Sequence, residues 1–338
     1  MCGIVGIINP EASQMIERST DMVSHRGPDD KGIYTFENLA FGHRRLAIMD
    51  LSPLGHQPMT SKDGRYTILF NGEIYNHLEL RKEILPDFEF KGTSDTETIL
   101  YAYIKIGEHL FPKLNGIFAL AIFDNHSKEL IIVRDQFGIK PLYFYHKEGN
   151  FYFASELKSL LGLNIDKSID HNAFSHYLYF LYSPGEQTPF LHVKKMKPGH
   201  VIRFNIENPS AYIYQQFYDI PFEGKYTDKS QDELVKEVDA HLTKALERQL
   251  LSDVPVGFFL SGGLDSSAMV ALARKLYPDK KINTYTIDTG GGFDGFEDDL
   301  KYAKIVAKHL NVELDILKTE IDVVKDFDKM IWHLDEPQ

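Results

Sequence analysis

The sequence predicts two domains of different fold class, an antiparallel α+β domain followed by an α/β domain with a parallel sheet. Three observations predict this arrangement. A length of 338 residues is typical of two domains. Up to about residue 205, strand-like segments outnumber helical ones and are joined by short connections, as in antiparallel sheets. After about residue 210, strands and helices alternate, which is the pattern of a parallel sheet with crossover helices.

The expected strands of the first domain are apolar runs bounded by turn residues, namely residues 4–8, 32–36, 39–49, 65–70, 116–124, 129–134, 142–146 and 151–154. Helices are expected at residues 16–23, 75–85 and 94–106. The segment Ser94-Asp95-Thr96-Glu97 has the composition of a capping box, which opens a helix. Asn71-Gly72-Glu73 follows an apolar run directly and predicts a turn.

The second domain is expected to contain a helix at 231–251, a strand at 255–260, a helix at 266–276, and strands at 282–287 and 312–317. Between the last two strands, a helical stripe is formed by Phe296, Leu300, Ala303, Ala307 and Leu310. This alternation predicts a parallel, doubly wound sheet. Breaks at 208–210 and 221–224 place the boundary between 205 and 225, giving domains 1–210 and 211–338.

Composition excludes several function classes. The net charge is −12 and no basic run occurs, so we expect no nucleic-acid partner. No apolar run reaches the length of about 18 residues that a membrane helix needs. The histidines form no cluster with ligand spacing, so no zinc site is expected. A single cysteine and the absence of a signal-peptide pattern make the cytoplasm the default location.

The single cysteine, Cys2, is the second residue. Removal of Met1 would place a thiol and a free α-amine on one residue. The amine, with a reference pKa of about 7.7–8.0, could then take the thiol proton, which joins nucleophile and base in one unit. The following run, Gly3-Ile4-Val5-Gly6-Ile7-Ile8, predicts a buried strand behind the nucleophile. Taken alone, however, Met-Cys-Gly favours an ordinary chain start before a core strand.

A second chemical motif is the segment 261–267, Ser-Gly-Gly-Leu-Asp-Ser-Ser, between a predicted strand and helix. Its glycines allow backbone N–H groups to face an anion, and the helix N-terminus adds partial positive charge. Asp265 within it is unusual for an anion site unless it holds a cation such as Mg²⁺. The segment lacks the Gly-Lys-Ser/Thr of a Walker A loop. A phosphate site is favoured over a plain structural turn.

Together these motifs resemble a known family. Residues 261–267 resemble the pyrophosphate loop of N-type ATP pyrophosphatases, and Met1-Cys2-Gly3 resembles the start of class II glutamine amidotransferases. In this order they resemble glutamine-hydrolysing asparagine synthetases over the whole chain. Further matching segments are His25-Arg26-Gly27-Pro28-Asp29, Arg44-Arg45-Leu46-Ala47-Ile48, Asn71-Gly72-Glu73-Ile74-Tyr75-Asn76, Ser94-Asp95-Thr96-Glu97, residues 134–143 and Ala154-Ser155-Glu156-Leu157-Lys158.

The resemblance implies an N-terminal-nucleophile (Ntn) αββα sandwich, followed by an incomplete Rossmann-like domain of the adenine nucleotide alpha hydrolase type. It implies that Cys2 attacks glutamine and that Asn71 and Gly72 stabilise the oxyanion. The implied glutamine-binding residues are Arg45, Leu46, Ile48, Met49, Asn71, Gly72, Glu73 and Asp95. From the residues alone, a hairpin turn at Asn71-Gly72, an exposed strand position for Arg45 and a helix cap at Asp95 remain open.

For ATP and its pyrophosphate, the resemblance implies the residues Leu260, Ser261, Gly262, Gly263, Asp265, Ser266, Ser267 and Ile287, with Asp265 near Mg²⁺. Leu260 and Ile287 are nearly as well explained as core residues. The implied reaction uses glutamine, aspartate and ATP. Ammonia released at Cys2 passes internally and displaces AMP from an adenylated aspartate. A homodimer is one assembly compatible with the resemblance.

Two alternatives stay open at this point. A related ATP-dependent amidotransferase could use another acceptor, such as a sugar carboxylate, and the chain could also be only a glutaminase or glutamine-binding module. The sequence reaches Gln338 after about three parallel strands, whereas sheets average ~5–6. The Gly-Glu-Gly-x-Asp-Glu segment of the family does not occur in it. We therefore expect this chain to hydrolyse glutamine without making asparagine.

Overall fold

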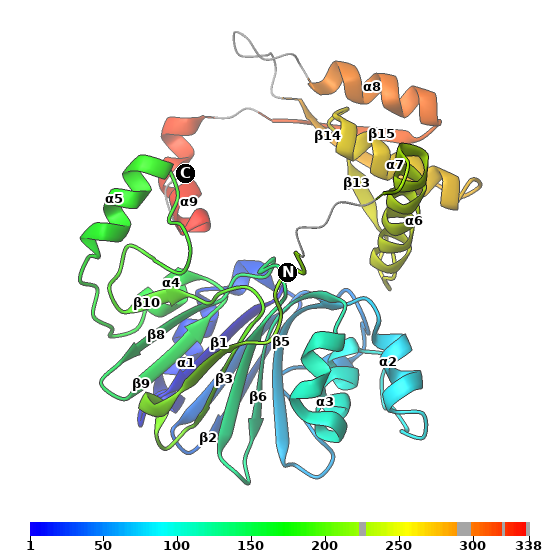
Figure 1. Ribbon diagram of the computed structural model, residues 1–338. Coiled ribbons are helices and arrows are strands. Elements are labelled where there is room, and N and C mark those ends of the chain that lie inside the picture. The colour runs from blue at the N-terminus through cyan, green and yellow to red at the C-terminus, as the bar shows by residue number, and fades with distance from the viewer. Residues whose placement is uncertain (223–227, 289–298, 320–321, 336–338) are drawn as a thin grey trace. The chain divides into compact units, whose positions relative to one another are not determined.

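A computed structural model of the chain describes residues 1–222, 228–288, 299–319 and 322–335. The chain forms two compact units (Figure 1). The first comprises Met1–Pro221 together with Ile331–Gln338, and the second comprises Phe222–Met330. Each unit is described by itself below. Within the described ranges, no helix combines the length and the apolar character needed to cross a bilayer.

The first unit contains two six-stranded sheets, and every strand pairing within them that is described below is antiparallel. One sheet has the order β10-β8-β9-β1-β3-β2, formed by Val193–Lys195, Tyr143–Lys147, Asn150–Ala154, Gly3–Ile8, Leu39–Arg45 and Asp30–Phe36. The other has the order β12-β11-β7-β6-β5-β4, formed by Ile213–Gln216, His200–Asn205, Glu129–Arg134, Gly116–Asp124, Tyr66–Ile74 and Met59–Thr60.

The two sheets pack face to face, and helices cover their outer faces. A core between the sheets joins residues of both, such as Phe41 and Phe153 with Ala121. The helices of this unit are α1 (Ala12–Asp21), α2 (His77–Ile84), α3 (Asp95–Ile106), α4 (Leu157–Leu161) and α5 (His171–Phe180). Helices α1 and α4 share a core with the first sheet, whereas α2 and α3 share one with the second. This four-layer arrangement, visible in Figure 1, confirms the predicted αββα sandwich.

Strand β1 consists of six consecutive small or apolar residues and lies inside its sheet. It pairs with β3 on one side and β9 on the other, and all six residues are buried. Because side chains alternate along a strand, Ile4 and Ile8 enter the core between the sheets, while Val5 and Ile7 pack beneath α1. A strand buried on both faces is fixed in place, and Cys2 directly precedes it.

The turn predicted at Asn71-Gly72-Glu73 is wrong. These residues continue β5, where Asn71 pairs with Ala119 and Gly72 with Phe118 of β6. A Cβ atom at Gly72 would lie 2.3 Å from the carbonyl oxygen of Ile117. The glycine therefore permits close approach of two strands rather than a turn.

The predicted capping box is half correct. The Ser94 side chain accepts a hydrogen bond of 3.1 Å from the Thr96 N–H, so Ser94 caps α3. Glu97 does not return the bond to Ser94, since its carboxylate accepts from the N–H groups of Lys91 and Gly92. Asp95 is the first residue of α3 rather than its cap, so the open alternative of a capping role is wrong.

The second unit contains a parallel sheet in the order β13-β14-β15, formed by Gly257–Phe259, Asn283–Asp288 and Glu313–Lys318. Its helices are α6 (Gln231–Gln249), α7 (Leu264–Leu276) and α8 (Asp299–Leu310). The last helix, α9 (Val323–Leu334), is divided between the two units after Met330. The predicted alternation is confirmed, although Phe296 lies outside the described residues. The described strands follow chain order, so the reversal of a doubly wound sheet is not among them.

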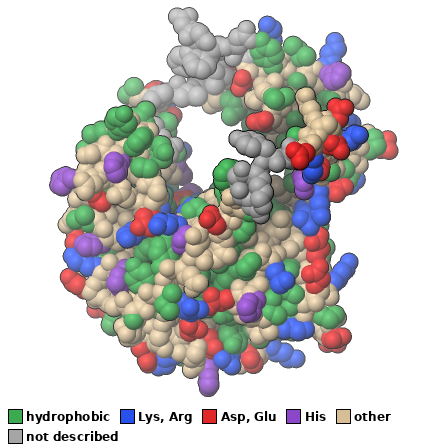
Figure 2. Space-filling view, viewed as in Figure 1, with side chains coloured by type: hydrophobic (Ala, Val, Ile, Leu, Met, Phe, Trp, Pro, Cys, Tyr) green, Lys and Arg blue, Asp and Glu red, His purple; other side chains and the backbone are tan. Residues whose placement is uncertain are grey.

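Exposed apolar side chains gather on α5 and the residues after it. Leu178, Tyr179 and Leu181 are each more than half exposed, and the apolar surface over α5 is visible in Figure 2. Elsewhere in that view acidic and basic side chains are interspersed. An apolar patch of this kind is typical of a surface that another segment or chain covers.

Candidate active site

A cleft opens in the first unit at the start of β1, and Cys2 lines it. All of the predicted glutamine-binding residues meet there, namely Arg45, Leu46, Ile48, Met49, Asn71, Gly72, Glu73 and Asp95. They come from β3, β5, the start of α3 and the loop after β3. The strand expected at 39–49 ends at Arg45, so its last predicted residues form this loop instead.

The thiol of Cys2 faces the loop after β3. Its Sγ lies 3.7 Å from the Leu46 carbonyl oxygen and accepts from the Leu46 N–H at 3.5 Å. Burial raises the pKa of the Cys2 thiol above its usual value. A thiol of this kind is neutral at neutral pH and needs a base to become the attacking thiolate.

The α-amine at the chain start is the base nearest in sequence to this thiol. The structure retains Met1, which also lines the cleft, so the amine that Cys2 would carry after processing is still a peptide nitrogen. Burial lowers the pKa of the Met1 α-amine, one residue away, below its usual value. A lowered pKa keeps more of the amine neutral near pH 7, as a base must be.

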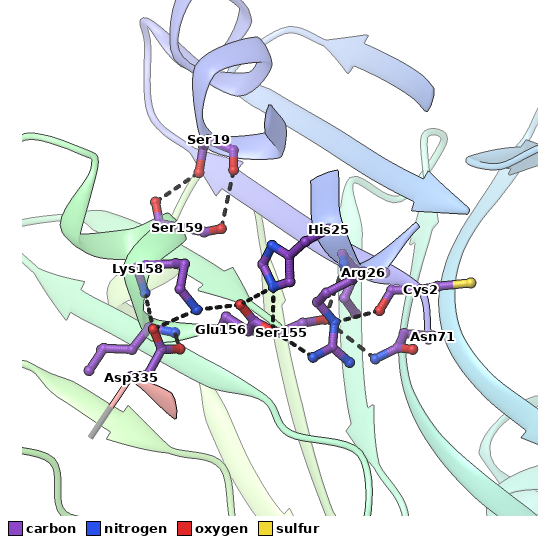
Figure 3. Close-up of polar contacts among 12 residues, drawn as sticks. Cys2, Ser19, His25, Arg26, Asn71, Ser155, Glu156, Lys158, Ser159 and Asp335 are labelled. Carbon is purple, nitrogen blue, oxygen red and sulfur yellow. Dashed lines mark hydrogen bonds and ion pairs between the residues drawn. The ribbon is translucent and has the colours of Figure 1, made fainter. Parts of the chain in front are cut away.

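Arg26 fixes the backbone of Cys2 from behind (Figure 3). Its Nε donates a 2.8 Å hydrogen bond to the Cys2 carbonyl oxygen, and its Nη1 donates a 2.7 Å bond to Glu156. Glu156 also contacts His25 and Lys158. Burial favours the neutral acid, but hydrogen bonds from Lys158 and Arg26 hold the pKa of Glu156 below its usual range. Charged, hydrogen-bonded side chains therefore hold the backbone of Cys2 in place.

Further contacts come from the end of α9 and from Asp335, the residue after it. Lys158 Nζ lies 2.8 Å from Asp335 Oδ1, and both side chains are less than a tenth exposed. Asp335 Oδ2 accepts a 2.6 Å hydrogen bond from the Leu157 N–H, at the first residue of α4. Trp332 covers the Lys158 ammonium at 4.8 Å from its ring centroid. These contacts hold residues 332–335 against residues 154–158. The sequence alone did not indicate this packing.

The guanidinium of Arg45 is held by the loop it anchors. Nη1 donates to the Ser52 carbonyl oxygen at 3.2 Å, and Nη2 donates to the carbonyl oxygens of Met49, at 3.2 Å, and Asp50. Arg45 is only 7% exposed, so the alternative of an exposed strand arginine is wrong. Because a guanidinium has five N–H donors, Nε and one Nη1 hydrogen remain beyond these three bonds.

Two carboxylates, Asp95 and Glu73, also line the cleft. Asp95 Oδ2 accepts a 2.9 Å hydrogen bond from the Ile74 N–H, and burial raises the pKa of Asp95 to about 6. Burial also raises the pKa of Glu73, against the opposing charge of Lys140. A bound ammonium group would favour the charged form of both acids.

The cleft lining also includes residues that sequence reasoning did not assign to the site, among them Gln57 and Lys140. Gln57 Oε1 accepts a 2.7 Å bond from the Phe70 N–H, and its Nε2 donates to Thr96 Oγ1 at 3.3 Å. It thereby ties the strand that carries Asn71 to the start of α3. Lys140 lies in the segment 134–143, whose resemblance to the family was the available signal for it. A single lysine in such a segment does not show that its side chain faces the cleft.

In the second unit, the segment 261–267 follows β13 and includes the first turn of α7, which begins at Leu264, two residues earlier than predicted. Gly262 has a φ of +82°, and a Cβ there would meet the backbone of Tyr302 and Ala303 at 2.5 Å. Ser261 and Ser266 share a 3.0 Å hydrogen bond between their hydroxyls. Ser267 Oγ is buried and has no hydrogen-bond partner among the described residues. A turn that exposes donors at the start of a long helix fits a phosphate group.

The remaining predicted nucleotide residues lie near the same sheet edge. Leu260 follows β13 directly, donates its N–H to the Tyr285 carbonyl oxygen and is buried. Ile287 lies near the carboxyl end of the parallel strand β14 and is 52% exposed. Asp265 is exposed in the first turn of α7. Ligands of open α/β sheets bind outside the carboxyl ends of the strands, which is where these residues are found.

Comparison with known proteins places this geometry in a family. Residues 1–218 match the model of the glutamine amidotransferase domain, and residues 237–338 match that of asparagine synthase. A chain of Methanocaldococcus jannaschii, provisionally named asparagine synthetase (glutamine-hydrolysing) 2, is 34% identical over 100% of this chain and 68% of its own length. The chain belongs to the family of glutamine-hydrolysing asparagine synthetases.

Two relatives from Bacillus subtilis support the same membership. Asparagine synthetase (glutamine-hydrolysing) 1 is 37% identical over 100% of this chain and 53% of its own length. Asparagine synthetase (glutamine-hydrolysing) 3 is 40% identical over 85% of this chain and 48% of its own length. The chain thus spans about half the length of these relatives. Membership in this family confirms the predicted resemblance.

Proposed function

We propose that this chain hydrolyses glutamine at Cys2 and supplies the ammonia to an ATP-dependent synthesis of asparagine. One observation carries the proposal. A single cleft gathers groups that complement each end of glutamine: the Arg45 guanidinium for the α-carboxylate, Asp95 and Glu73 for the α-ammonium, and the Cys2 thiol for the side-chain amide. Leu46, Ile48 and Met49 enclose the methylene chain between them.

The α-amine of processed Cys2 takes the thiol proton, and the thiolate attacks the amide carbon of glutamine. The carbonyl oxygen becomes an oxyanion, which the Asn71 side-chain amide and the Gly72 N–H stabilise. The protonated amine then returns its proton to the leaving nitrogen, so ammonia departs and a thioester remains. A water, deprotonated by the same amine, attacks the thioester and releases glutamate with the thiol restored.

For the second half of the reaction, residues 211–338 are proposed to supply the nucleotide-binding part of the site, with residues 1–210 as the glutaminase domain. Segment 261–267 binds the pyrophosphate of ATP, and Leu260 and Ile287 contact the adenosine. Asp265 is the proposed Mg²⁺ ligand, since an exposed carboxylate beside phosphate oxygens suits that ion. Adenylation makes an aspartate carboxylate oxygen a good leaving group, and ammonia then displaces AMP. A reduced thiol nucleophile fits a cytoplasmic setting, and a homodimer is the proposed assembly.

The test is the variant Cys2→Ala. We expect it to abolish glutamate release while glutamine binding is largely retained, because the thiol makes the bond whereas Arg45 and Asp95 hold the substrate. Glutamate release and glutamine binding are measured on the same preparation, the latter by calorimetry. Turnover retained in Cys2→Ala would remove the thiol from the mechanism, and loss of binding would give it a structural role instead.

A further inference from the structure

Ser155 is a buried hydroxyl next to the chain start. It directly follows β9, and its N–H donates a 2.9 Å hydrogen bond to the Ile4 carbonyl oxygen. Its Oγ accepts a 3.1 Å bond from the Ile4 N–H. The residue is fully buried and does not line the cleft. These two bonds tie Ser155 to β1, and only the second involves the hydroxyl, whose own proton is left to be directed elsewhere.

The side-chain amide of Asn71 contacts this hydroxyl. Asn71 Nδ2 lies 3.4 Å from Ser155 Oγ (Figure 3). In this orientation the hydroxyl oxygen faces two N–H donors, from Ile4 and Asn71, while its proton meets no acceptor in the described parts of the chain. Asn71 Oδ1 is buried and also has no partner among the described residues. One buried donor and one buried acceptor are left unpaired, which native interiors rarely tolerate.

Exchange of the amide oxygen and nitrogen gives the Ser155 hydroxyl proton an acceptor and leaves the NH₂ donors free for a ligand. The two ends of an amide have nearly the same shape, and the surrounding hydrogen bonds decide which end is oxygen. With the oxygen toward Ser155, the hydroxyl accepts from Ile4 and donates to Asn71 Oδ1. The NH₂ group then takes the other end, away from Ser155. Since Asn71 lines the cleft with Cys2 and Ser155 does not, that end serves the cleft.

We propose that Ser155 is a positioning residue that orients the Asn71 amide so that its NH₂ group donates to the oxyanion formed at Cys2. The proposal rests on the proposed function, because it explains how the oxyanion donor is held before substrate arrives. Ser155 also fixes β1 through Ile4. One hydroxyl therefore holds both the strand that follows the nucleophile and the side-chain amide of Asn71. Preorganised donors of this kind need no rearrangement during the reaction.

The kinetic test compares Ser155→Ala with Asn71→Ala, the double variant and the matched control Ser159→Ala. Ser159 is also fully buried, and its hydroxyl donates to the Ser19 carbonyl oxygen away from the cleft. We expect Ser155→Ala to lower kcat about tenfold, the effect of one hydrogen bond, with KM unchanged. Asn71→Ala should lower kcat ~10²–10³-fold, and the double variant should match it because both act through one amide.

A second readout separates positioning from general damage. The aldehyde analogue of glutamine adds to the thiol and forms the oxyanion, whereas glutamate binds without reacting. Ser155→Ala should weaken the aldehyde about tenfold and leave glutamate affinity unchanged, in line with the loss of one hydrogen bond. Equal weakening of both, a kcat equal to that of Ser159→Ala, or a double variant that loses the product of both effects would overturn the proposal.

The amide orientation can also be read without any activity. Neutron diffraction from crystals of the deuterated protein locates the deuterons of Asn71 and Ser155. We expect the amide deuterons on the end away from Ser155 and the hydroxyl deuteron directed at Asn71 Oδ1. Amide deuterons facing Ser155 would overturn the inference even if glutamine is hydrolysed. The expected arrangement in a chain that releases no glutamate would instead leave the orientation correct and refute the proposed function.

Discussion

Substitution of Gly55 by alanine should disable the glutamine carboxylate site without altering any charged residue. A Cβ atom at Gly55 would lie 1.9 Å from Arg45 Nη2 and 2.9 Å from the Asp50 carbonyl oxygen. Ordinary contacts require about 3.5 Å, so the guanidinium would have to move by on the order of 1.5 Å. It has little freedom to do so, because the carbonyl oxygens of Met49, Asp50 and Ser52 hold it.

The size of the effect follows from the bonds that a displaced guanidinium loses. Each hydrogen bond to a charged group is worth about 1.5–3 kcal/mol, and about 1.4 kcal/mol corresponds to a tenfold change in affinity. Loss of one bond to the substrate carboxylate should therefore raise KM for glutamine ~10- to 100-fold. Because Cys2 and Asn71 are untouched, kcat should change much less, which is the mark of lost ground-state binding.

The assay is glutamate release as a function of glutamine concentration, with thermal denaturation recorded for each variant. Gly162→Ala is the matched control. The nearest heavy atom to a Cβ there is 3.4 Å away, and its φ of −70° suits any residue. An unchanged KM in Gly55→Ala would refute the reasoning that Arg45, held in this position, binds the carboxylate. A fall in kcat alone would place Arg45 in the chemical step.

Two further outcomes are expected. Asp95 must be ionised to bind the α-ammonium, and its pKa is raised to about 6. We therefore expect kcat/KM for glutamine to fall about tenfold per pH unit below pH 6. A profile that stays flat down to pH 5 would contradict this role. Gly72→Ala places a Cβ 2.3 Å from the Ile117 carbonyl oxygen, and such overpacking costs about 1–3 kcal/mol. Its melting temperature should therefore drop by about 2–10 °C, and an unchanged value would show that β5 and β6 can separate there.

The sequence predicted the elements whose signal is local. The buried run of β1, the alternation after residue 210 and the Ser94 cap are visible in short windows, because side-chain period and capping chemistry act over a few residues. The cleft residues came from the family resemblance rather than from pattern. No spacing rule could bring Cys2, Arg45 and Asp95 together, since they lie on three separate elements that only the packed sheets align.

The errors and omissions have physical causes. Asn71-Gly72 has the composition of a turn, but Gly72 lies inside β5, where it lets β6 approach closely. This role becomes visible only when the partner strand β6 is known. Gln57 acts through hydrogen bonds to Phe70 and Thr96, which are distant in sequence. Lys158 pairs with Asp335, a contact between residues far apart in the chain. Long-range polar pairs leave no periodic trace in a sequence.

The central claim is that nucleophile and base are one residue, with the α-amine of Cys2 serving the Cys2 thiol. The most direct measurement is glutamate release by two preparations that differ only at the chain start, each verified by mass spectrometry. One has Met1 removed, and the other keeps Met1, which lines the cleft in the structure. The account predicts activity only in the first preparation. Equal kcat in both would show that the base lies elsewhere and would contradict the account.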